Sequence, residues 1–349
     1  MKALYFLGDS QAVVKEVPVP RPGPGEVLVQ MKAAGLCGSD LHGQYERSMA
    51  EIEARNKRLG RDLISGHEPC GVVDSLGAGT RGIEVGDRVM VNISKSCGVC
   101  AWCRSGWTNL CKQRVAYGWG PDGCFADFMV AEDRNLVKMP EWLSYEVGAH
   151  LTCGGGTVYS SLRRLNIMKD EVALAVGLGP VGLGGVAIMK GWGAKVIGVD
   201  LTEERLKLAM EMGADEVIDA SKENVLERVK ALTDGADVNV AADFSGSPIG
   251  RNNCIDATGI LGRVAFIGEQ NQRPEMTLDP SKQLFAKRIT LYSSRSYGFH
   301  ELMQLLQFME KHNVRMDNMI THRFPLEKGS EAFELFQTTK TGKVVFIWP

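Results

Sequence analysis

One uncharged segment, Val172 to Met189, restricts the fold more than any other feature of the sequence. Its 18 residues nominally reach the length of a short membrane span. However, it holds five glycines and a proline, including the run Gly177-Leu178-Gly179-Pro180-Val181-Gly182. Between a strand and a helix, such a run allows a tight turn and lets the helix N-terminus receive a pyrophosphate. We therefore interpret the segment as a buried strand and its crossover helix, not as a membrane helix.

The region from 154 to 296 alternates apolar strands with helical segments. Helix-like segments cover Glu203 to Met212 and Val225 to Thr233. The six strand candidates are Glu171 to Val176, Ala194 to Val199, Glu216 to Ile218, Val238 to Ala242, Gly262 to Ile267 and Ile289 to Ser293. This alternation predicts an α/β domain with a doubly wound parallel sheet of the Rossmann type.

Residues 1 to 153 have a different style, with short alternating runs such as Val27 to Met31 separated by Gly and Pro turns. They predict a mostly β domain. Within it, the charged segment Arg47 to Arg61 predicts an exposed helix that could border a substrate entrance. The tail, 297 to 349, predicts a helix over His300 to His312 and a final strand over Lys343 to Ile347.

Composition and charge narrow the class of protein. A net charge of -2 and a pI near 6.3 give no basic excess, so we expect no nucleic-acid partner. The opening MKALYFLGDS has no signal-peptide pattern, so we expect a cytoplasmic protein without a membrane partner. In a reducing compartment, clustered cysteines indicate metal rather than disulfides.

Four of the nine cysteines are clustered within a loop at about 95–113: Cys97, Cys100, Cys103 and Cys111. Four thiolates complete the tetrahedral coordination of zinc and leave no open position. The spacing therefore predicts a structural zinc site.

A second set of metal-ligating residues is dispersed along the chain. Cys37 begins the segment CGSDLH, His67 stands in GHE, and Cys153 precedes a run of glycines. Two cysteines and one histidine with an open fourth position are one form of catalytic zinc site. Taken singly, each cysteine could equally be a small buried hydrophobic residue.

Asp200 ends the second predicted strand, 18 residues after Gly182. An acidic residue there can accept hydrogen bonds from the adenosine ribose and repels a 2′-phosphate, which favours NAD over NADP. The alternative is a helix N-cap before Glu203. Arg205 could flank the ribose or be an exposed helix cation.

These motifs occur in the order and at the spacing of one family. The chain resembles the zinc-containing medium-chain alcohol dehydrogenases over nearly its whole length. The matching segments are CGSDLH, GHE, the four cysteines, GLGPVG, Cys153 to Leu162 and the tail ITHRFPLEKGSEAFELF with Gly342 to Val345. The resemblance implies a GroES-like catalytic domain over 1–153, a Rossmann NAD-binding domain over 154–296, and a return to the catalytic domain over 297–349.

The resemblance also implies roles for individual residues. Cys37, His67 and Cys153 would bind the catalytic zinc. Glu68 would be a carboxylate able to approach the metal, and Asp40 would orient His67 through its other ring nitrogen. These assignments make two zinc ions per chain.

Ser39 and His42 match the family's proton relay, which leads the substrate hydroxyl proton past the nicotinamide ribose to solvent. Thr157 matches the position that packs against the nicotinamide. The implied reaction passes a hydride between an alcohol, or in reverse an aldehyde or ketone, and NAD, with zinc as Lewis acid. Family members are homodimers or homotetramers, and we expect one of these states.

Two departures bear on the substrate. Polyol and threonine dehydrogenases commonly carry Glu where this chain has Cys153, which favours an alcohol or carbonyl substrate. The segment between His42 and Gly66 is also longer than the family leads us to expect. A polyol, sugar-derivative or amino-alcohol dehydrogenase is the alternative within enzymes. A non-catalytic zinc- or nucleotide-binding protein is the alternative from another class.

Overall fold

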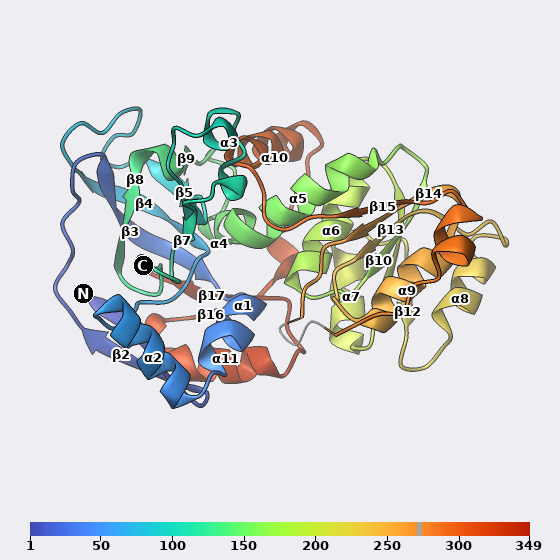
Figure 1. Cartoon of the computed structure of the whole chain (residues 1–349), viewed down its shortest axis with the longest axis horizontal. Coiled ribbons are helices and arrows are strands. Elements are labelled where there is room, and N and C mark those ends of the chain that lie inside the picture. The colour runs from blue at the N-terminus through green and yellow to red at the C-terminus, as the bar shows by residue number, and fades with distance from the viewer. Residues whose placement is uncertain (271–273) are drawn as a thin grey trace.

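The computed structural model describes residues 1–270 and 274–349. Figure 1 shows a lobe built on an antiparallel sheet beside a second lobe built on a parallel sheet. This arrangement confirms the predicted α/β class.

The parallel sheet contains all six predicted strands, in the order β12-β11-β10-β13-β14-β15. The strands are β10 (Val172–Val176), β11 (Lys195–Asp200), β12 (Glu216–Asp219), β13 (Val238–Asp243), β14 (Thr258–Phe266) and β15 (Thr290–Ser293). Helices cover both faces, so the strands read as nearly continuous apolar runs. These helices include α6 (Pro180–Gly191), α7 (Glu203–Glu211), α8 (Val225–Leu232) and α9 (Pro248–Ala257).

One strand boundary differs from the prediction by more than one residue. β14 begins at Thr258 rather than at Gly262, because its pairing with β13 shifts register between Val238 and Val240. The first residues of the strand include the exposed Ile260 and Leu261. Such an irregular, half-exposed stretch lacks the regular alternation of apolar and polar residues by which a strand is recognised in a sequence.

The antiparallel sheet has the order β16-β17-β3-β4-β5-β9, with β8 also beside β3. Two further pairs, β1 with β2 and β6 with β7, lie outside it. The strands of this lobe are β1 (Lys2–Gly8), β2 (Gln11–Glu16), β3 (Glu26–Gly35), β4 (Pro69–Leu76), β5 (Arg88–Val91), β6 (Ser94–Lys95), β7 (Val115–Ala116), β8 (Phe128–Glu132), β9 (Leu136–Lys138), β16 (Ile320–Phe324) and β17 (Lys343–Ile347). The tail therefore completes the sheet that the N-terminal region begins.

The remaining helices connect and cover these sheets. In chain order they are α1 (Gly38–Asp40), η1 (Leu41–Tyr45), α2 (Met49–Leu59), α3 (Ala101–Arg104), η2 (Thr108–Leu110), η3 (Asp133–Asn135), α4 (Tyr145–His150), η4 (Leu151–Gly155), α5 (Gly156–Leu162), η5 (Arg163–Leu165), η6 (Pro280–Phe285), α10 (Phe299–Lys311), η7 (Asp317–Met319), η8 (Leu326–Lys328) and α11 (Gly329–Gln337). Among the described residues, no helix combines the length and the apolar character that crossing a bilayer requires.

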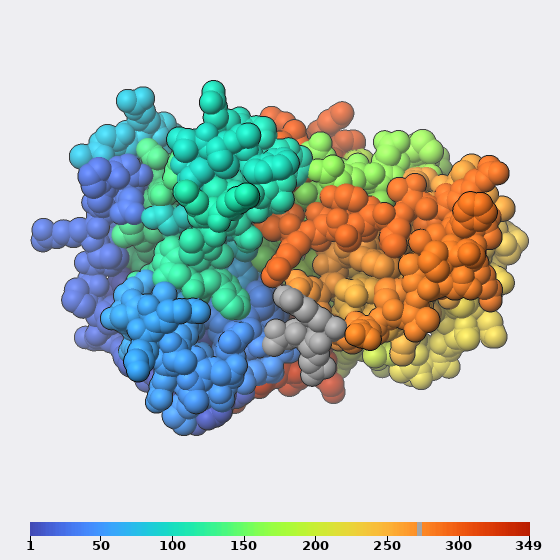
Figure 2. Space-filling view, in the orientation of Figure 1, coloured from blue at the N-terminus to red at the C-terminus, as the bar shows by residue number. Residues whose placement is uncertain are grey.

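The predicted charged helix is α2. Ser48 caps it by accepting the Glu51 N–H and donating to the Glu51 carboxylate, and Gly60 ends it in the left-handed conformation. Ile52 is its buried residue, and Figure 2 shows the helix on the surface. The sequence prediction of an exposed helix is confirmed.

A continuous run of helix, α4, η4 and α5, joins the two lobes. Its apolar residues Val147, Leu151 and Val158 belong to one hydrophobic core with Ala173 of β10 and Leu302 of α10. In addition, α10 packs against α5 and α6. The lobes are therefore joined by shared core rather than by a linker.

A buried histidine lies within this junction. His150 is fully buried, and neither of its ring nitrogens has a hydrogen-bond partner in the described structure. A Cβ on Gly154 would lie 2.5 Å from its ring and one on Gly184 of α6 would lie 3.0 Å away. Glycines therefore make room for the imidazole, and burial lowers the pKa of His150 to about 3.

We predict that His150 makes the fold sensitive to acid. The unfolded chain takes up this proton near pH 6.5 and the folded chain only near pH 3. Stability therefore falls as the pH drops below 6.5, by about 2 kcal/mol between pH 7 and pH 5 from this residue. Urea unfolding at both pH values should show that His150→Leu removes this loss, whereas the exposed-site control His312→Leu retains it. Equal pH dependence in all three proteins would refute the prediction.

Candidate active site

The dispersed cysteine and histidine candidates meet at the junction of the lobes. Cys37 precedes α1, His67 and Glu68 precede β4, and Cys153 lies in η4. One donor atom from each of these four residues lies within 4.8 Å of the others. The fold thus brings together residues that are more than 100 positions apart in the sequence.

Asp40 holds the His67 ring in one orientation. Its Oδ1 lies 2.9 Å from His67 Nδ1, and its Oδ2 accepts the Cys37 N–H at 3.2 Å. Both side chains are buried. Burial lowers the pKa of His67, but the Asp40 carboxylate outweighs this effect and the net pKa is raised. The predicted partnership therefore leaves Nε2 of His67 to face the other donors.

The two cysteines of this cluster interact strongly with each other. The hydrogen bond with Cys153 lowers the pKa of Cys37, and the same bond together with burial raises the pKa of Cys153. One thiolate and one thiol thus share a proton. Because a zinc ion would replace that proton, the two sulfurs and one imidazole nitrogen fit catalytic zinc with an open fourth position.

Glu68 forms a buried ion pair with Lys343 of β17. The Lys343 ammonium also donates to the Leu36 carbonyl at 2.8 Å. A Cβ on Gly35 would come within 2.1 Å of Glu68 Oε2, so a glycine there makes room for the pair. Burial raises the pKa of Glu68 to about 8, against the opposing effect of Lys343. The sequence analysis did not identify Gly35 or the function of Lys343. Lys343 could have been noticed, because a lysine begins an otherwise apolar strand.

The four clustered cysteines form the second donor group, again within 4.8 Å of one another. The backbone N–H groups of Val99 and Cys100 lower the pKa of Cys97 to about 6. The N–H of Cys97 in turn lies 3.4 Å from Cys111 Sγ. N–H groups directed at sulfur favour thiolates, so this loop fits a closed zinc site.

The same loop contacts the other lobe. The Trp107 ring packs edge-on against His300 of α10, with centroids 4.9 Å apart. His300 Nδ1 also lies 3.1 Å from the Gly106 carbonyl oxygen. The loop thus lies against the lobe that carries the parallel sheet, as Figure 1 shows for α3 and α10.

The glycine run forms the predicted turn between β10 and α6. Gly177 has φ +91°, and a Cβ on Gly182 would lie 1.9 Å from the Gly177 carbonyl oxygen. Gly179 precedes the helix, which starts at Pro180. The N-terminus of α6 thus opens at the carboxyl end of β10, next to the point where the strand order reverses, as dinucleotide binding requires.

Asp200 lies beside this turn. Its Oδ2 accepts the Leu178 N–H at 2.7 Å, and its Oδ1 accepts the Leu201 and Thr202 N–H groups. The N-cap of α7 is Thr202, so the alternative function of Asp200 as N-cap is not what the structure has. Arg205 is partly buried, and its Nε lies 3.4 Å from the Thr341 carbonyl oxygen.

The remaining predicted residues lie near the dispersed donors or on the helix that follows them. Ser39 Oγ is 3.3 Å from Cys37 Sγ and 3.3 Å from His67 Nε2. His42 lies in η1, where its Nδ1 is 2.7 Å from Glu46 Oε2. Thr157 lies in α5, four residues after Cys153.

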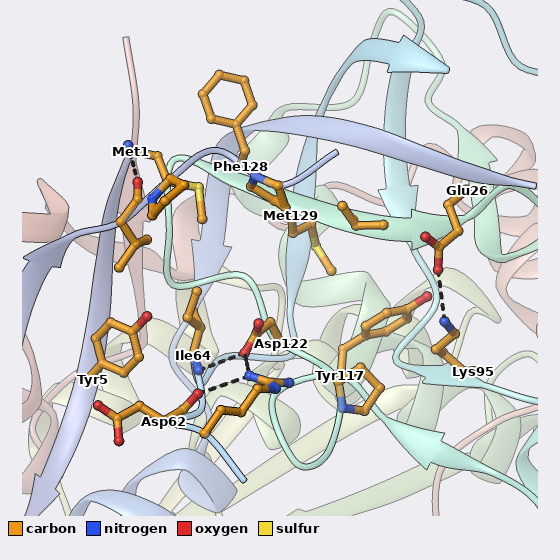
Figure 3. Close-up of a pocket in the computed structure, with 16 residues that line it drawn as sticks. Met1, Tyr5, Glu26, Asp62, Ile64, Lys95, Tyr117, Asp122, Phe128 and Met129 are labelled. Carbon is orange, nitrogen blue, oxygen red and sulfur yellow. Dashed lines mark hydrogen bonds and ion pairs between the residues drawn. The ribbon is translucent and has the colours of Figure 1, made fainter. Parts of the chain in front are cut away.

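A separate groove of about 450 Å³ lies in the N-terminal lobe. Figure 3 shows Tyr5, Tyr117 and Met129 around it, with the ion pair between Lys95 and Glu26 at one side. None of the site residues predicted from the sequence lines it. This groove is therefore separate from the candidate active site at the junction of the lobes.

Comparisons with known proteins show the family of the chain. The family model of the alcohol dehydrogenase GroES-like domain matches residues 23–141, and that of the zinc-binding dehydrogenase matches residues 180–311. The chain is 37% identical over 353 residues to the zinc-type alcohol dehydrogenase-like protein YphC of Escherichia coli, covering 100% of this chain and 99% of that protein. It is 35% identical over 339 residues to L-threonine 3-dehydrogenase of Pyrococcus horikoshii, covering 96% and 95%.

A solved structure has the same architecture. Alcohol dehydrogenase TADH from Thermus sp. ATN1 superposes with a TM-score of 0.88 at 27% identity and covers 99% of each chain. Both domain families, their order and the full-length relatives agree with the two donor clusters. The chain therefore belongs to the zinc-dependent medium-chain alcohol dehydrogenase family.

Proposed function

We propose that this chain is an NAD-dependent zinc alcohol dehydrogenase that transfers a hydride between an alcohol and NAD, or in reverse to an aldehyde or ketone. The observation that carries the proposal is the convergence of Cys37, His67 and Cys153 on one point. Three such ligands leave a coordination position for substrate.

In this proposal Cys37, His67 and Cys153 hold the catalytic zinc, and the four-cysteine loop holds a second, structural zinc. When bound, the catalytic ion supplies Lewis-acid chemistry at the substrate oxygen. Asp40 keeps the Nδ1 proton of His67 engaged, so that Nε2 carries the lone pair for the metal. Glu68 lies beside this set, in contact with the Lys343 ammonium.

NAD would lie at the turn made by Gly177 to Gly182, with its nicotinamide against Thr157. The cofactor supplies the hydride acceptor. The Asp200 carboxylate would accept hydrogen bonds from the ribose hydroxyls and repel a 2′-phosphate, and Arg205 would flank the ribose. A dehydrogenase of Escherichia coli at 26% identity is described as complexed with NADH, which supports this choice.

Ser39 and His42 would remove the substrate proton. Ser39 Oγ lies beside the metal ligands, where it can accept the proton from a substrate hydroxyl. His42 is half exposed and can release the proton to solvent. The relay would pass through the nicotinamide ribose, so proton transfer requires the cofactor to be in place.

An amino-alcohol substrate is the second candidate. Several relatives at 30–35% identity are L-threonine 3-dehydrogenases. Arg114 supports this alternative, because the guanidinium is partly buried and close enough to Cys153 and Tyr297 to interact electrostatically. It donates to Ser94 Oγ and has no carboxylate partner among the described residues. Such a cation suits a substrate that carries a carboxylate.

We further propose that the protein is cytoplasmic and a homodimer or homotetramer.

Metal analysis tests the two zinc sites. We expect two zinc ions per chain, and a single ion in fully loaded protein would contradict the proposal.

Because Cys103 belongs to the closed site, Cys103→Ser should lower stability by several kcal/mol. Cys153→Ser should reduce turnover at least 100-fold with little change in melting temperature. Similar damage to fold and turnover in both variants would argue against separate functions.

Cofactor selectivity tests Asp200. The ratio of kcat/KM with NAD to that with NADP should fall at least tenfold in Asp200→Gly, because the charge that repels a 2′-phosphate is gone. Asp215→Gly is the control, since Asp215 pairs with Lys190 away from the turn. Unchanged selectivity in Asp200→Gly would place discrimination elsewhere.

A matched substrate panel separates the two candidate substrates. Initial rates with NAD are compared for 2-butanol, cyclohexanol, a polyol, 3-hydroxybutanoate and L-threonine. If Arg114 binds a carboxylate, Arg114→Met should reduce kcat/KM about tenfold for the two carboxylates and spare 2-butanol; the exposed Arg104→Met is the control. A loss shared by neutral and charged substrates would remove the argument for the second candidate. No turnover with any substrate would reject the proposed function.

A further inference from the structure

The carboxylate of Glu46, directly after η1, is held by two side chains. Its Oε2 lies 2.7 Å from His42 Nδ1, and its Oε1 accepts a hydrogen bond from Gln337 Nε2 at 3.1 Å. Gln337 ends α11, 291 positions further along the chain. In Figure 1 the segment from α1 onward lies next to α11. Each carboxylate oxygen therefore has its own partner, from a different part of the chain.

The backbone around Glu46 explains how the carboxylate reaches His42. η1 is a π-helical turn, and the Glu46 N–H donates to the Leu41 carbonyl five residues back. Residues four apart on a helical turn lie on the same side, which places Glu46 beside His42. π-Helical turns are rare and occur frequently at functional sites.

The pair contributes little to folding. The exposed fractions of the two side chains are 51% for His42 and 35% for Glu46, and such partly exposed pairs stabilise proteins very little. Its main effect is therefore on the orientation and protonation pattern of the imidazole. Substitution of Glu46 should consequently leave the fold intact, which makes the pair suitable for a kinetic test.

A carboxylate at Nδ1 determines which nitrogen carries the proton. Burial raises the pKa of Glu46, but the hydrogen bonds with His42 and Gln337 outweigh it and hold the pKa below its usual value. The ionised group can only accept hydrogen bonds, so Nδ1 of His42 must be the donor. In the neutral ring the lone pair then resides on Nε2. An aspartate has the same effect on the histidine of a serine-protease triad.

We propose that Glu46 is a positioning residue that fixes His42 in the tautomer able to accept the substrate proton; this rests on the proposed relay function of His42. In alcohol oxidation the substrate O–H bond would break, Ser39 would pass the proton onward, and Nε2 of His42 would accept it; bound NAD would supply a ribose hydroxyl between the two side chains. NAD, when bound, would accept the electron pair of the broken C–H bond as hydride. The imidazolium keeps its Nδ1–H on Glu46 and gives the Nε2 proton to solvent water.

Two substitutions separate the charge of Glu46 from its hydrogen bond. Glu46→Gln keeps an acceptor for Nδ1–H but removes the charge that stabilises the imidazolium. Glu46→Met removes both the acceptor and the charge. Glu53→Gln on the exposed face of α2 is the matched control, and His42→Gln identifies the His42 signals and completes a double-variant cycle.

The first readout is ¹⁵N NMR of histidine-labelled enzyme without substrate. We expect His42 to carry its proton on Nδ1 in the wild type and in Glu46→Gln, and to shift to the Nε2–H tautomer in Glu46→Met. A wild-type His42 in the Nε2–H form would overturn the proposal. Because this measurement needs no turnover, it tests Glu46 even if the proposed function fails on every substrate.

The second readout is the steady-state rate of alcohol oxidation. Glu46→Met should lower kcat about tenfold and leave KM within twofold, because the group acts on proton transfer rather than on binding. In the His42→Gln background the same substitution should cause no further loss. Unchanged kcat in Glu46→Met, or a loss that adds fully to that of His42→Gln, would overturn the proposal.

Discussion

Two carboxylates withdrawn from water, Asp40 and Glu68, impose the constraint that the rest of the site satisfies. An ionised group in a protein interior needs partners, because its hydration has been lost. Asp40 has the His67 ring and the Cys37 N–H, and Glu68 has the Lys343 ammonium. These contacts bring the α1 turn, the start of β4 and the first residue of β17 to a common point. A zinc ion there would meet donors that are already aligned.

The helical run through α4, η4 and α5 connects this point with the glycine turn at Gly177 to Gly182. It carries Cys153 of the Cys37, His67, Glu68 and Cys153 cluster and Thr157 one turn later, and its apolar side packs into the core shared with β10 and α10. Because η4 and α6 also enclose His150, a shift of the turn at Gly177 would be felt at Cys153 through direct packing. The two substrates of a hydride transfer would therefore be positioned by one rigid unit.

The features predictable from sequence are those encoded over short distances. The four-cysteine spacing, the glycine run and the six strands each specify their structure within a few residues, and the structure has all of them. The dispersed ligands needed the family resemblance, because Cys37 or Cys153 alone reads as a small buried residue. The sequence could not predict the contact of Glu46 with Gln337 or that of Lys343 with Glu68. It also could not predict that His150 is buried without a hydrogen-bond partner among the described residues. These features depend on contacts between distant segments, which leave no period or spacing in the sequence.

The position of β17 has a consequence for how the protein is made. This strand pairs with β3 through Val345 and Gly35, and it brings Lys343 to Glu68. The ribosome synthesises it after the whole parallel-sheet domain, which can fold as a unit while synthesis continues. Until then the sheet beside Cys37 is incomplete and Glu68 lacks its partner Lys343. The domain that the ribosome begins first is therefore completed last. Its cysteine thiols are consequently the last to be enclosed by folded structure during biosynthesis.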